Sequence, residues 1–247
     1  MSAAPPLIEA RGFSLHAAGR ALLQDLDWCV RPGERWCVIG RNAAGKSTLL
    51  RALAGLPVPQ RAGELRWLGR RQSDWLPADA AWLRAYAPQQ CVDRFPISVA
   101  RLLALSTVRP GPHRADALLA ALDAADLAAR PVRQLSGGER QRIALAQCAI
   151  QGAPLLLMDE AVSFQDPAHQ SQLARWLVAL VPPGGEAALV VSAHDVNWIA
   201  RVATHVLALL GGGRWRAGAC SEMLDAGLLQ QVYGCRWRET GGVWVTD

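Results

Sequence analysis

The residues best suited to chemistry surround Lys46, the only lysine among 247 residues. It lies in residues 40–47, GRNAAGKS, which match the pattern G-x-x-x-x-G-K-[ST]. A short apolar run, residues 36–39, predicts a buried strand before this segment, and residues 47–54 predict a helix that ends at Gly55. Because a glycine turn between a strand and a helix directs backbone N–H groups toward an anion, the sequence predicts a phosphate-binding loop.

The side chains of this loop suit a nucleotide polyphosphate. Lysine carries a compact ammonium that reaches between two phosphates, where the wide fork of arginine would not fit. The hydroxyl of Ser47 is a ligand for Mg²⁺. The alternative is a glycine turn that merely precedes a helix. Ala43 stands where a glycine is possible, so we expect the loop to pass this position at negative φ.

A pair of carboxylates follows a second apolar run, residues 153–158. A continuous apolar run is typical of a central parallel strand buried on both faces, and ligands bind at the carboxyl ends of such strands. Asp159 could hold the magnesium ion, and Glu160 could orient or deprotonate an attacking water. An acidic pair is a weak signal alone, and the phosphate loop makes it a strong one.

Residues 135–142, LSGGERQR, form a third motif. Ser136 and Glu139 have the spacing of a capping box, which predicts a helix over residues 140–151. The cap does not explain the two glycines between them, because glycine weakens a first helical turn. Glycines at a helix N-terminus leave N–H groups open to an anion.

Together, and in this order, these motifs resemble those of the nucleotide-binding subunit of ABC transporters, whose signature sequence is similar to residues 135–142. The resemblance implies an α/β fold with a P-loop NTPase core of RecA-like type, in which a mainly parallel sheet is joined by an antiparallel β part and a helical subdomain. It also implies ATP and Mg²⁺ as ligands, ATP hydrolysis coupled to transmembrane transport, and a head-to-tail homodimer. In that dimer, the signature of one copy completes the ATP site around Lys46 of the other.

The resemblance extends to three further segments. Gln89 matches the glutamine that links the nucleotide to the membrane partner, and His194 matches the switch histidine at the γ-phosphate. Residues 163–166 match the D-loop, which crosses the dimer interface. Taken singly, Gln89 could be a turn residue and His194 a structural hydrogen bonder, but the order of the motifs argues against both.

The resemblance assigns roles to particular positions. The catalytic residues are Lys46, Gln89, Glu160 and His194. The ATP-binding residues are Gly40, Arg41, Asn42, Ala43, Ala44, Gly45, Lys46, Ser47 and Thr48. The magnesium ligands are Ser47, Gln89 and Asp159. The signature residues that meet the ATP of the second copy are Ser136, Gly137, Gly138 and Glu139, and the D-loop residues are Ser163 and Asp166.

Three departures from the family pattern remove none of these groups. Residues 161–162 stand where Pro-Thr is common, and residues 164–165 where Ala-Leu is usual. Before Gly19, where the family has an aromatic ring that stacks on adenine, only His16 or Ala17 is found, and His16 is the candidate for stacking. We therefore expect an active ATPase rather than a degenerate cassette.

We expect one ABC ATPase domain over residues 1–247, without internal repeats. Residues 1–89 and 151–247 would form the α/β nucleotide-binding core, and residues 90–150 the helical subdomain. By resemblance, that subdomain grips the membrane subunit. Besides the signature helix, it is expected to contain helices over residues 99–105 and 115–124.

Composition narrows the setting. With 51% hydrophobic and 19% charged residues, the chain can form a sizeable core. No apolar run reaches the roughly 20 residues of a membrane-spanning helix, and no secretory signal is seen, so we expect a soluble, non-exported protein. The six cysteines form no C-x-x-C pair and are expected to be reduced core residues. The net charge of +5 reflects a bias toward arginine, and no nucleic-acid partner is expected.

Three short segments, residues 95–99, 166–170 and 232–234, resemble cassettes that serve importers of iron chelates, haem and cobalamin. This looser resemblance implies a transmembrane permease, with the chain peripheral on the cytoplasmic side of an inner or plasma membrane. A periplasmic or extracellular substrate-binding protein would be an indirect partner. The alternative is a soluble ABC ATPase acting on ribosomes or DNA, although such types generally carry two cassettes or a long coiled-coil insert. A third alternative, a metabolic P-loop kinase, is excluded by the signature sequence in residues 135–142.

Overall fold

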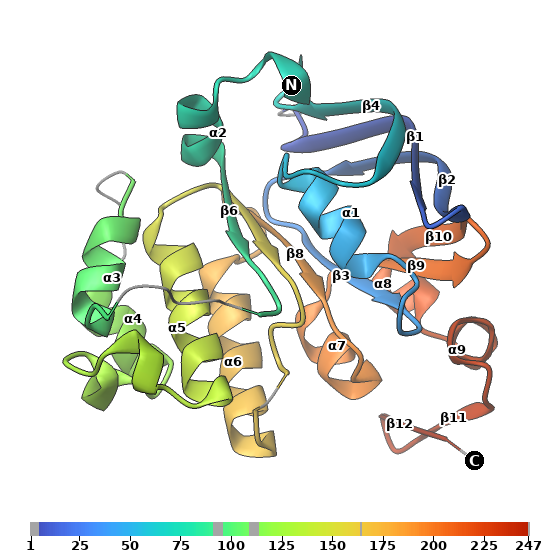
Figure 1. Cartoon of the computed structure of the whole chain (residues 1–247). Coiled ribbons are helices and arrows are strands. Elements are labelled where there is room, and N and C mark those ends of the chain that lie inside the picture. The colour runs from blue at the N-terminus through green and yellow to red at the C-terminus, as the bar shows by residue number, and fades with distance from the viewer. Residues whose placement is uncertain (1–4, 91–95, 109–113, 164, 247) are drawn as a thin grey trace.

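A computed structural model describes residues 5–90, 96–108, 114–163 and 165–246. Its centre is a six-stranded sheet in the order β10-β9-β3-β8-β7-β6 (Figure 1), in which β10 alone is antiparallel to its neighbour. The strands are β3 (Arg35–Gly40), β6 (Arg84–Ala87), β7 (Leu155–Met158), β8 (Ala188–Ser192), β9 (His205–Gly211) and β10 (Arg214–Ala219).

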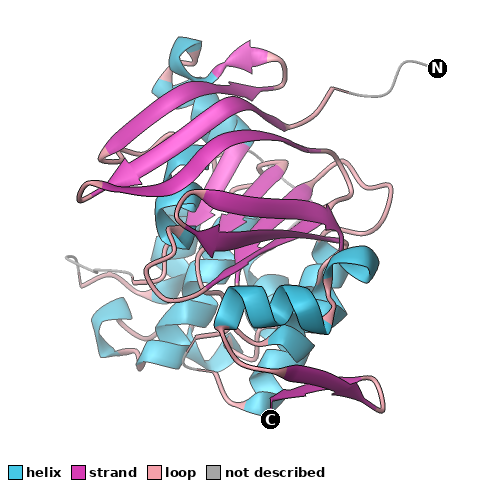
Figure 2. Ribbon diagram, turned by 90° about the vertical axis from the view of Figure 1, so that its right-hand side faces the viewer, coloured by secondary structure: helices cyan, strands magenta, loops and turns pink. Residues whose placement is uncertain are grey.

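A second, antiparallel sheet has the order β2-β1-β4-β5 and is seen beside the central sheet in Figure 2. Its strands are β1 (Ile8–Ala17), β2 (Arg20–Val30), β4 (Gln60–Trp67) and β5 (Arg70–Arg71). A separate two-stranded hairpin, β11 (Trp237–Thr240) and β12 (Val243–Thr246), lies near the C-terminal end of the chain.

The described α-helices are α1 (Lys46–Leu53), α2 (Pro77–Leu83), α3 (Val99–Ser106), α4 (Ala115–Ala121), α5 (Gly137–Ile150), α6 (Pro167–Leu180), α7 (Val196–Val202), α8 (Cys220–Met223) and α9 (Ala226–Tyr233). Helices α3, α4 and α5 form a group at the left of Figure 1, while α1 lies between the two sheets. The phosphate-loop helix and the signature helix therefore belong to different parts of the molecule.

The central sheet is buried on both faces, as the continuous apolar runs predict. In β7, Leu155 and Leu157 pack toward α1 and the antiparallel sheet, whereas Leu156 and Met158 pack toward α5 and α6. All four are 3% exposed or less. Their alternation holds the strand rigidly between two cores, so the carboxylates that follow it are fixed in place.

The predicted fold class is confirmed by the mainly parallel sheet, its antiparallel companion and the helical group. The helix expected over residues 115–124 ends three residues early, because Asp123 adopts a left-handed φ of +50° that stops a helix. The signature helix starts at Gly137 rather than at residue 140, because the Ser136 cap includes the glycines in its first turn. The limits of the helical subdomain stay a prediction.

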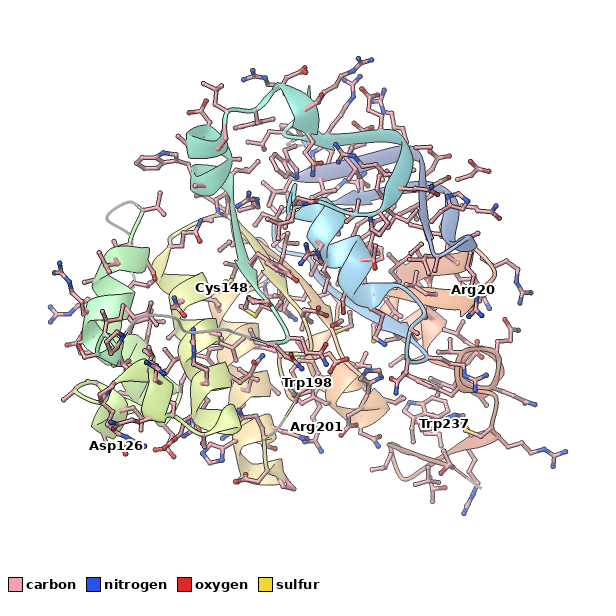
Figure 3. The ribbon with its side chains drawn as sticks, in the orientation of Figure 1. Arg20, Asp126, Cys148, Trp198, Arg201 and Trp237 are labelled. Atoms are coloured by element: carbon pink, nitrogen blue, oxygen red, sulfur yellow. The ribbon has the colours of Figure 1, made fainter. Side chains whose placement is uncertain are left out.

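Within the described ranges, no helix has both the length and the apolar character needed to cross a membrane. The five described cysteines are free thiols, as expected, but only Cys37 and Cys148 are buried, and the other three are partly exposed. Burial raises the pKa of Cys148, which lies on α5 in the interior (Figure 3), to about 12. Cys91 lies outside the described residues.

Candidate functional site

The phosphate loop joins the end of β3 at Gly40 to the first residue of α1, Lys46. Gly45 caps the helix at a φ of +104°, and a Cβ placed there would come within 2.9 Å of the Leu22 side chain. Only glycine combines that backbone conformation with such a close approach. The loop therefore brings the first N–H groups of α1 to the surface of a cavity that Gly45, Lys46, Ser47 and Thr48 help to line.

Ala43 corrects one prediction, because its φ is +61° and not negative. The N–H of Ala44 donates to the carbonyl of Arg41 at 3.1 Å, which closes a turn over residues 41–44. A turn with a left-handed third residue normally takes glycine there. An alanine in this conformation costs roughly 1–2 kcal/mol, which the surrounding loop must offset.

Lys46 is 5% exposed, and its side chain folds back along the loop. Its Nζ donates to the carbonyls of Gly40 at 2.9 Å and Arg41 at 3.2 Å. Burial lowers the pKa of Lys46, while the charges of Glu160 and Asp159 act in the opposite direction. The ammonium is thus held in the loop by backbone carbonyls, at the position where a phosphate group would meet it.

Ser192, the last residue of β8, connects the two carboxylates that follow β7. Its Oγ donates to Oδ1 of Asp159 at 2.7 Å and accepts from the backbone N–H of Glu160 at 2.7 Å. Asp159 is only 2% exposed. Sequence reasoning missed Ser192, although a polar residue that ends an apolar strand two positions before His194 was an available signal.

Glu160 is the meeting point of the site. Its Oε2 accepts from Nε2 of Gln89 at 2.6 Å and from Oγ of Ser163 at 2.9 Å, and its Oε1 lies 3.0 Å from Nε2 of His194. Burial raises the pKa of this carboxyl, but the hydrogen bonds from His194 and Ser163 and the charges of His194 and Lys46 outweigh it, so the pKa lies below its ordinary value. Glu160 is therefore held as a carboxylate.

Gln89, Glu160 and His194 line an open cavity of about 700 Å³, whereas Asp159, Ser163 and Ser192, all described by the structure, are not part of its lining. Its lining consists of Ala17, Leu22, Asn42, Ala43, Gly45, Lys46, Ser47, Thr48, Gln89, Glu160 and His194. Among the described residues, His16 is not part of the lining and its neighbour Ala17 is, because successive side chains of β1 point to opposite faces. The geometry thus gives no support to His16 as the residue that stacks on adenine.

The cavity fits a nucleotide with its metal ion. A helix N-terminus, an ammonium and the hydroxyls of Ser47 and Thr48 converge on one end, which is the donor set that a polyphosphate requires. Over the ranges that the structure describes, no three His, Cys, Asp or Glu side chains gather to hold a metal by themselves. Ser47 and Gln89, which line the cavity, carry oxygen ligands of the kind that Mg²⁺ takes, with phosphate oxygens and water completing its shell.

The signature segment lies at the start of α5, and none of its residues contributes to the cavity lining given above. Ser136 and Glu139 form the predicted capping box, with hydrogen bonds of 3.3 and 2.7 Å. Arg130 pairs with Glu139 at 2.8 Å. The Gly138 carbonyl accepts from Nε2 of Gln165 at 2.9 Å, so the signature is tied to the D-loop of its own chain.

The D-loop segment connects the site to α6. Ser163 contacts Glu160, and Asp166 caps α6 by accepting from the N–H of His169 at 2.9 Å. Phe164 lies outside the described residues. One side of this short segment therefore contacts the carboxylate of the cavity, and the other starts a helix.

A phosphate loop on one strand, a carboxylate pair on a nearby parallel strand and a capped, glycine-led helix in a separate helical group define a P-loop nucleotide hydrolase. The family model for ABC transporters matches residues 23–163 of the chain. The chain belongs to the ABC transporter family, as an ATP-binding subunit.

Relatives support this assignment over nearly the full length. The hemin import ATP-binding protein HmuV of Streptomyces coelicolor is 40% identical, over 92% of this chain and 83% of the relative. The hemin import ATP-binding protein HmuV of Roseobacter denitrificans is 35% identical, over 94% of this chain and 92% of the relative. A solved ATP-binding subunit of an ABC transporter has the same fold, with a TM-score of 0.78 at 23% identity, over 92% of this chain and 98% of the solved one.

Membership of this family makes the chain an ATPase, with ATP as its ligand and a membrane permease as its partner. The predictions of an ABC ATPase fold and of ATP hydrolysis are confirmed at this level. The roles of individual site residues, the magnesium ion and the dimer stay predictions.

Proposed function

We propose that this chain hydrolyses ATP to drive the import of haem or a related iron chelate through a membrane permease. This choice of cargo is supported by the two relatives described above, which are named for hemin import and are 40% and 35% identical to this chain. Cobalamin was an equal expectation from short sequence segments, and neither of these relatives is named for it.

The observation that carries the hydrolytic part of the proposal is the convergence of three side chains on Glu160. In this proposal Glu160 orients or deprotonates the attacking water, since its carboxylate is ionised and faces the phosphate end of the cavity. His194 and Gln89 hold the carboxylate and contact the terminal phosphate. Lys46 stabilises the charge that develops on the phosphate oxygens.

Residues 40–48 would surround the phosphates with backbone N–H groups, as helix N-termini do in other anion sites. Ser47, Gln89 and Asp159 would hold Mg²⁺, which supplies further neutralisation of phosphate charge when bound. The Ser192 hydroxyl donates to the Asp159 carboxylate and would orient it toward the ion.

The proposed catalytic unit is a head-to-tail homodimer. The signature helix starts outside the cavity of its own chain, so residues 136–139 are available to a nucleotide held by a second copy. The N–H groups of that first helical turn are suited to a phosphate anion. We place the dimer on the cytoplasmic side of an inner or plasma membrane, as a peripheral subunit, with a substrate-binding protein acting on the other side of the permease.

The first test is the substitution Glu160→Gln. Removing the carboxylate while keeping its shape should lower ATP turnover by about a hundredfold or more and leave ATP binding intact, as loss of a key polar catalytic group does. Phosphate release measures turnover, and calorimetry measures binding. The matched control is Glu222→Gln at an exposed position on α8, which should keep normal turnover. Near-normal turnover of the Glu160 variant would refute the role of this residue.

The same Glu160→Gln variant tests whether the chain works with a membrane permease. Purified with ATP from native membranes, it should carry a polytopic permease that mass spectrometry identifies. Permease-containing vesicles should then take up haem in an ATP-dependent way when the wild-type chain is present. If ribosomal proteins or DNA-bound partners co-purify and no permease does, the transporter proposal is refuted in favour of a soluble ABC ATPase.

A further inference from the structure

The last 21 described residues form a segment that contributes no residue to the phosphate loop or to the hydrogen bonds of Glu160 described above. It consists of α9 followed by the hairpin β11–β12, whose strands pair only with each other. A two-stranded hairpin by itself is marginally stable in water. Contacts with the rest of the molecule must therefore hold it in place.

The main polar contact of the hairpin involves Trp244, in the middle of β12. Its N–H donates to Oδ1 of Asn197 at 2.8 Å, and its carbonyl accepts from Nδ2 of Asn197 at 3.0 Å. Within the hairpin Trp244 lies opposite Glu239, and the tight turn pairs Thr240 with Val243. In such a register the N–H and carbonyl of alternate residues point outward. The amide of Asn197 thus takes the place of a neighbouring strand.

Asn197 stands in the first turn of α7, three residues after His194. Asp195 fixes the backbone of this turn, because its Oδ1 accepts from the N–H groups of Asn197 at 2.8 Å and Trp198 at 3.0 Å. On the opposite side, Nε1 of Trp198 donates to the carbonyl of Gln170 on α6 at 3.1 Å. The turn that follows His194 is therefore held between α6 and the hairpin.

The other end of the segment packs against the central sheet. Helix α9 contacts β9 and β3, its residues Leu228 and Val232 belong to the buried core, and Gly234 ends the helix at a left-handed φ of +79°. The ring of Tyr233, the last residue of α9, lies 5.6 Å from that of Trp237, the first residue of β11. Figure 3 shows Trp237 beside the end of α9, and Figure 1 shows the hairpin next to α7. The segment thus contacts both the central sheet and the helix that follows His194.

We propose that Asn197 is a positioning residue for the ATPase reaction. Its paired hydrogen bonds to Trp244 hold the first turn of α7, and with it His194, at 3.0 Å from Glu160. This inference rests on the proposed role of His194. Because His194 itself is 39% exposed, little packing fixes its ring, and the helix behind it has to do so.

The test is Asn197→Ala in the full-length chain. Both hydrogen bonds to Trp244 are lost, so kcat for ATP should fall by about tenfold, the size of effect that a small misplacement of a catalytic group produces. KM and the calorimetric Kd for ATP should stay within about twofold, since the phosphate loop is untouched. Asn197→Asp, which keeps the acceptor for the Trp244 N–H and loses the donor, should give an intermediate kcat.

A double variant separates positioning from general loss of stability. In the His194→Ala background, Asn197→Ala should have no further effect on kcat, because the group that it positions is gone. The control Gln172→Ala removes an amide hydrogen bond to the backbone of Ala121 at 2.8 Å, away from His194, and should leave kcat unchanged. Unfolding temperatures are measured for all variants.

Each outcome decides between the two proposals. A normal kcat for Asn197→Ala, or an additive loss in the double variant, overturns the positioning role. If Asn197→Ala fails to fold, Asn197→Asp takes its place in the same cycle. A normal kcat for His194→Ala alone would instead refute the role of His194 under the proposed function.

Discussion

At the residue scale, Lys46 is singular in a chain whose other 25 basic Lys/Arg residues are arginines. Its ammonium fits between the carbonyls of Gly40 and Arg41 because three short N–H donors radiate from one atom. A planar guanidinium is wider and longer, and would have to leave the loop or push it open. Lysine is therefore kept at position 46 because an arginine side chain would not fit there, although arginine is used at every other Lys/Arg position.

Lys46→Arg keeps the charge and should still weaken ATP binding by about tenfold or more, because the fork cannot occupy the same space. Calorimetry with ATP gives the affinity. The control is Arg51→Lys in the same helix, an exposed residue whose side chain donates to the carbonyl of Pro57 at 3.2 Å. Equal affinities of Lys46→Arg and the wild type would contradict the fit described here.

Sequence predicted those residues whose role depends on near neighbours. The Ser136–Glu139 cap and the phosphate loop follow from local spacing, so both are predictable from the sequence alone. The left-handed φ of Ala43 could not, because the turn over residues 41–44 is set by the loop as a whole. Ser192 was also missed, because its importance comes from two strands that are adjacent only after folding.

At the element scale, one buried side chain joins the ends of two helices. Arg35, at the start of β3, is 7% exposed and donates to the carbonyl of Val181 at the end of α6 at 2.6 Å, and to that of Val202 at the end of α7 at 2.7 Å. A cation at helix C-termini also complements their dipoles. Burial lowers the pKa of Arg35, and the carbonyls of Val181 and Val202 hold its guanidinium in place.

Arg35→Met should lower the free energy of unfolding by about 3 kcal/mol, because two buried carbonyls lose a charged donor. Urea denaturation followed by circular dichroism measures this difference. Arg175→Met, at an exposed position on α6, should change stability by less than about 0.5 kcal/mol. Equal midpoints for the two variants would show that Arg35 is not a cap of α6 and α7.

Elements were predictable where apolar runs are short and continuous, as in β3, β7 and β8, since such runs are typical of parallel strands buried on both faces. Their boundaries were less so. Helix α4 stops at Ala121 because the chain must turn at Asp123 toward the signature segment, a tertiary requirement that the alanine-rich sequence conceals. The pairing of β12 with a side-chain amide of α7 has no sequence signal at all.

At the scale of the whole molecule, the phosphate cavity and the signature helix lie in different parts of one chain. Two copies placed head to tail would bring them together twice. The proposed dimer makes ATP binding and dimer formation dependent on each other, because the nucleotide then contributes to both surfaces.

Gly138→Asp tests this arrangement. An acidic residue is favourable in the first turn of a helix, so α5 should fold normally, but its carboxylate would face the phosphate of the second copy. In the Glu160→Gln background with ATP, analytical ultracentrifugation should show a dimer, and the added Gly138→Asp change should leave a monomer that still binds ATP. Ala117→Asp, exposed on α4, is the control that should remain dimeric. A dimer that survives Gly138→Asp would exclude the head-to-tail geometry.

The position of the hairpin has a practical consequence for anyone who purifies this protein. Strand β12 lies beside α7 at the lower edge of Figure 1, while β1 lies at the upper edge. An affinity tag fused after β12 would disturb the strand whose backbone is hydrogen-bonded to Asn197, whereas a tag placed before β1 would leave these hydrogen bonds intact. Preparations tagged at opposite ends should therefore be compared before any catalytic rate is attributed to the native enzyme.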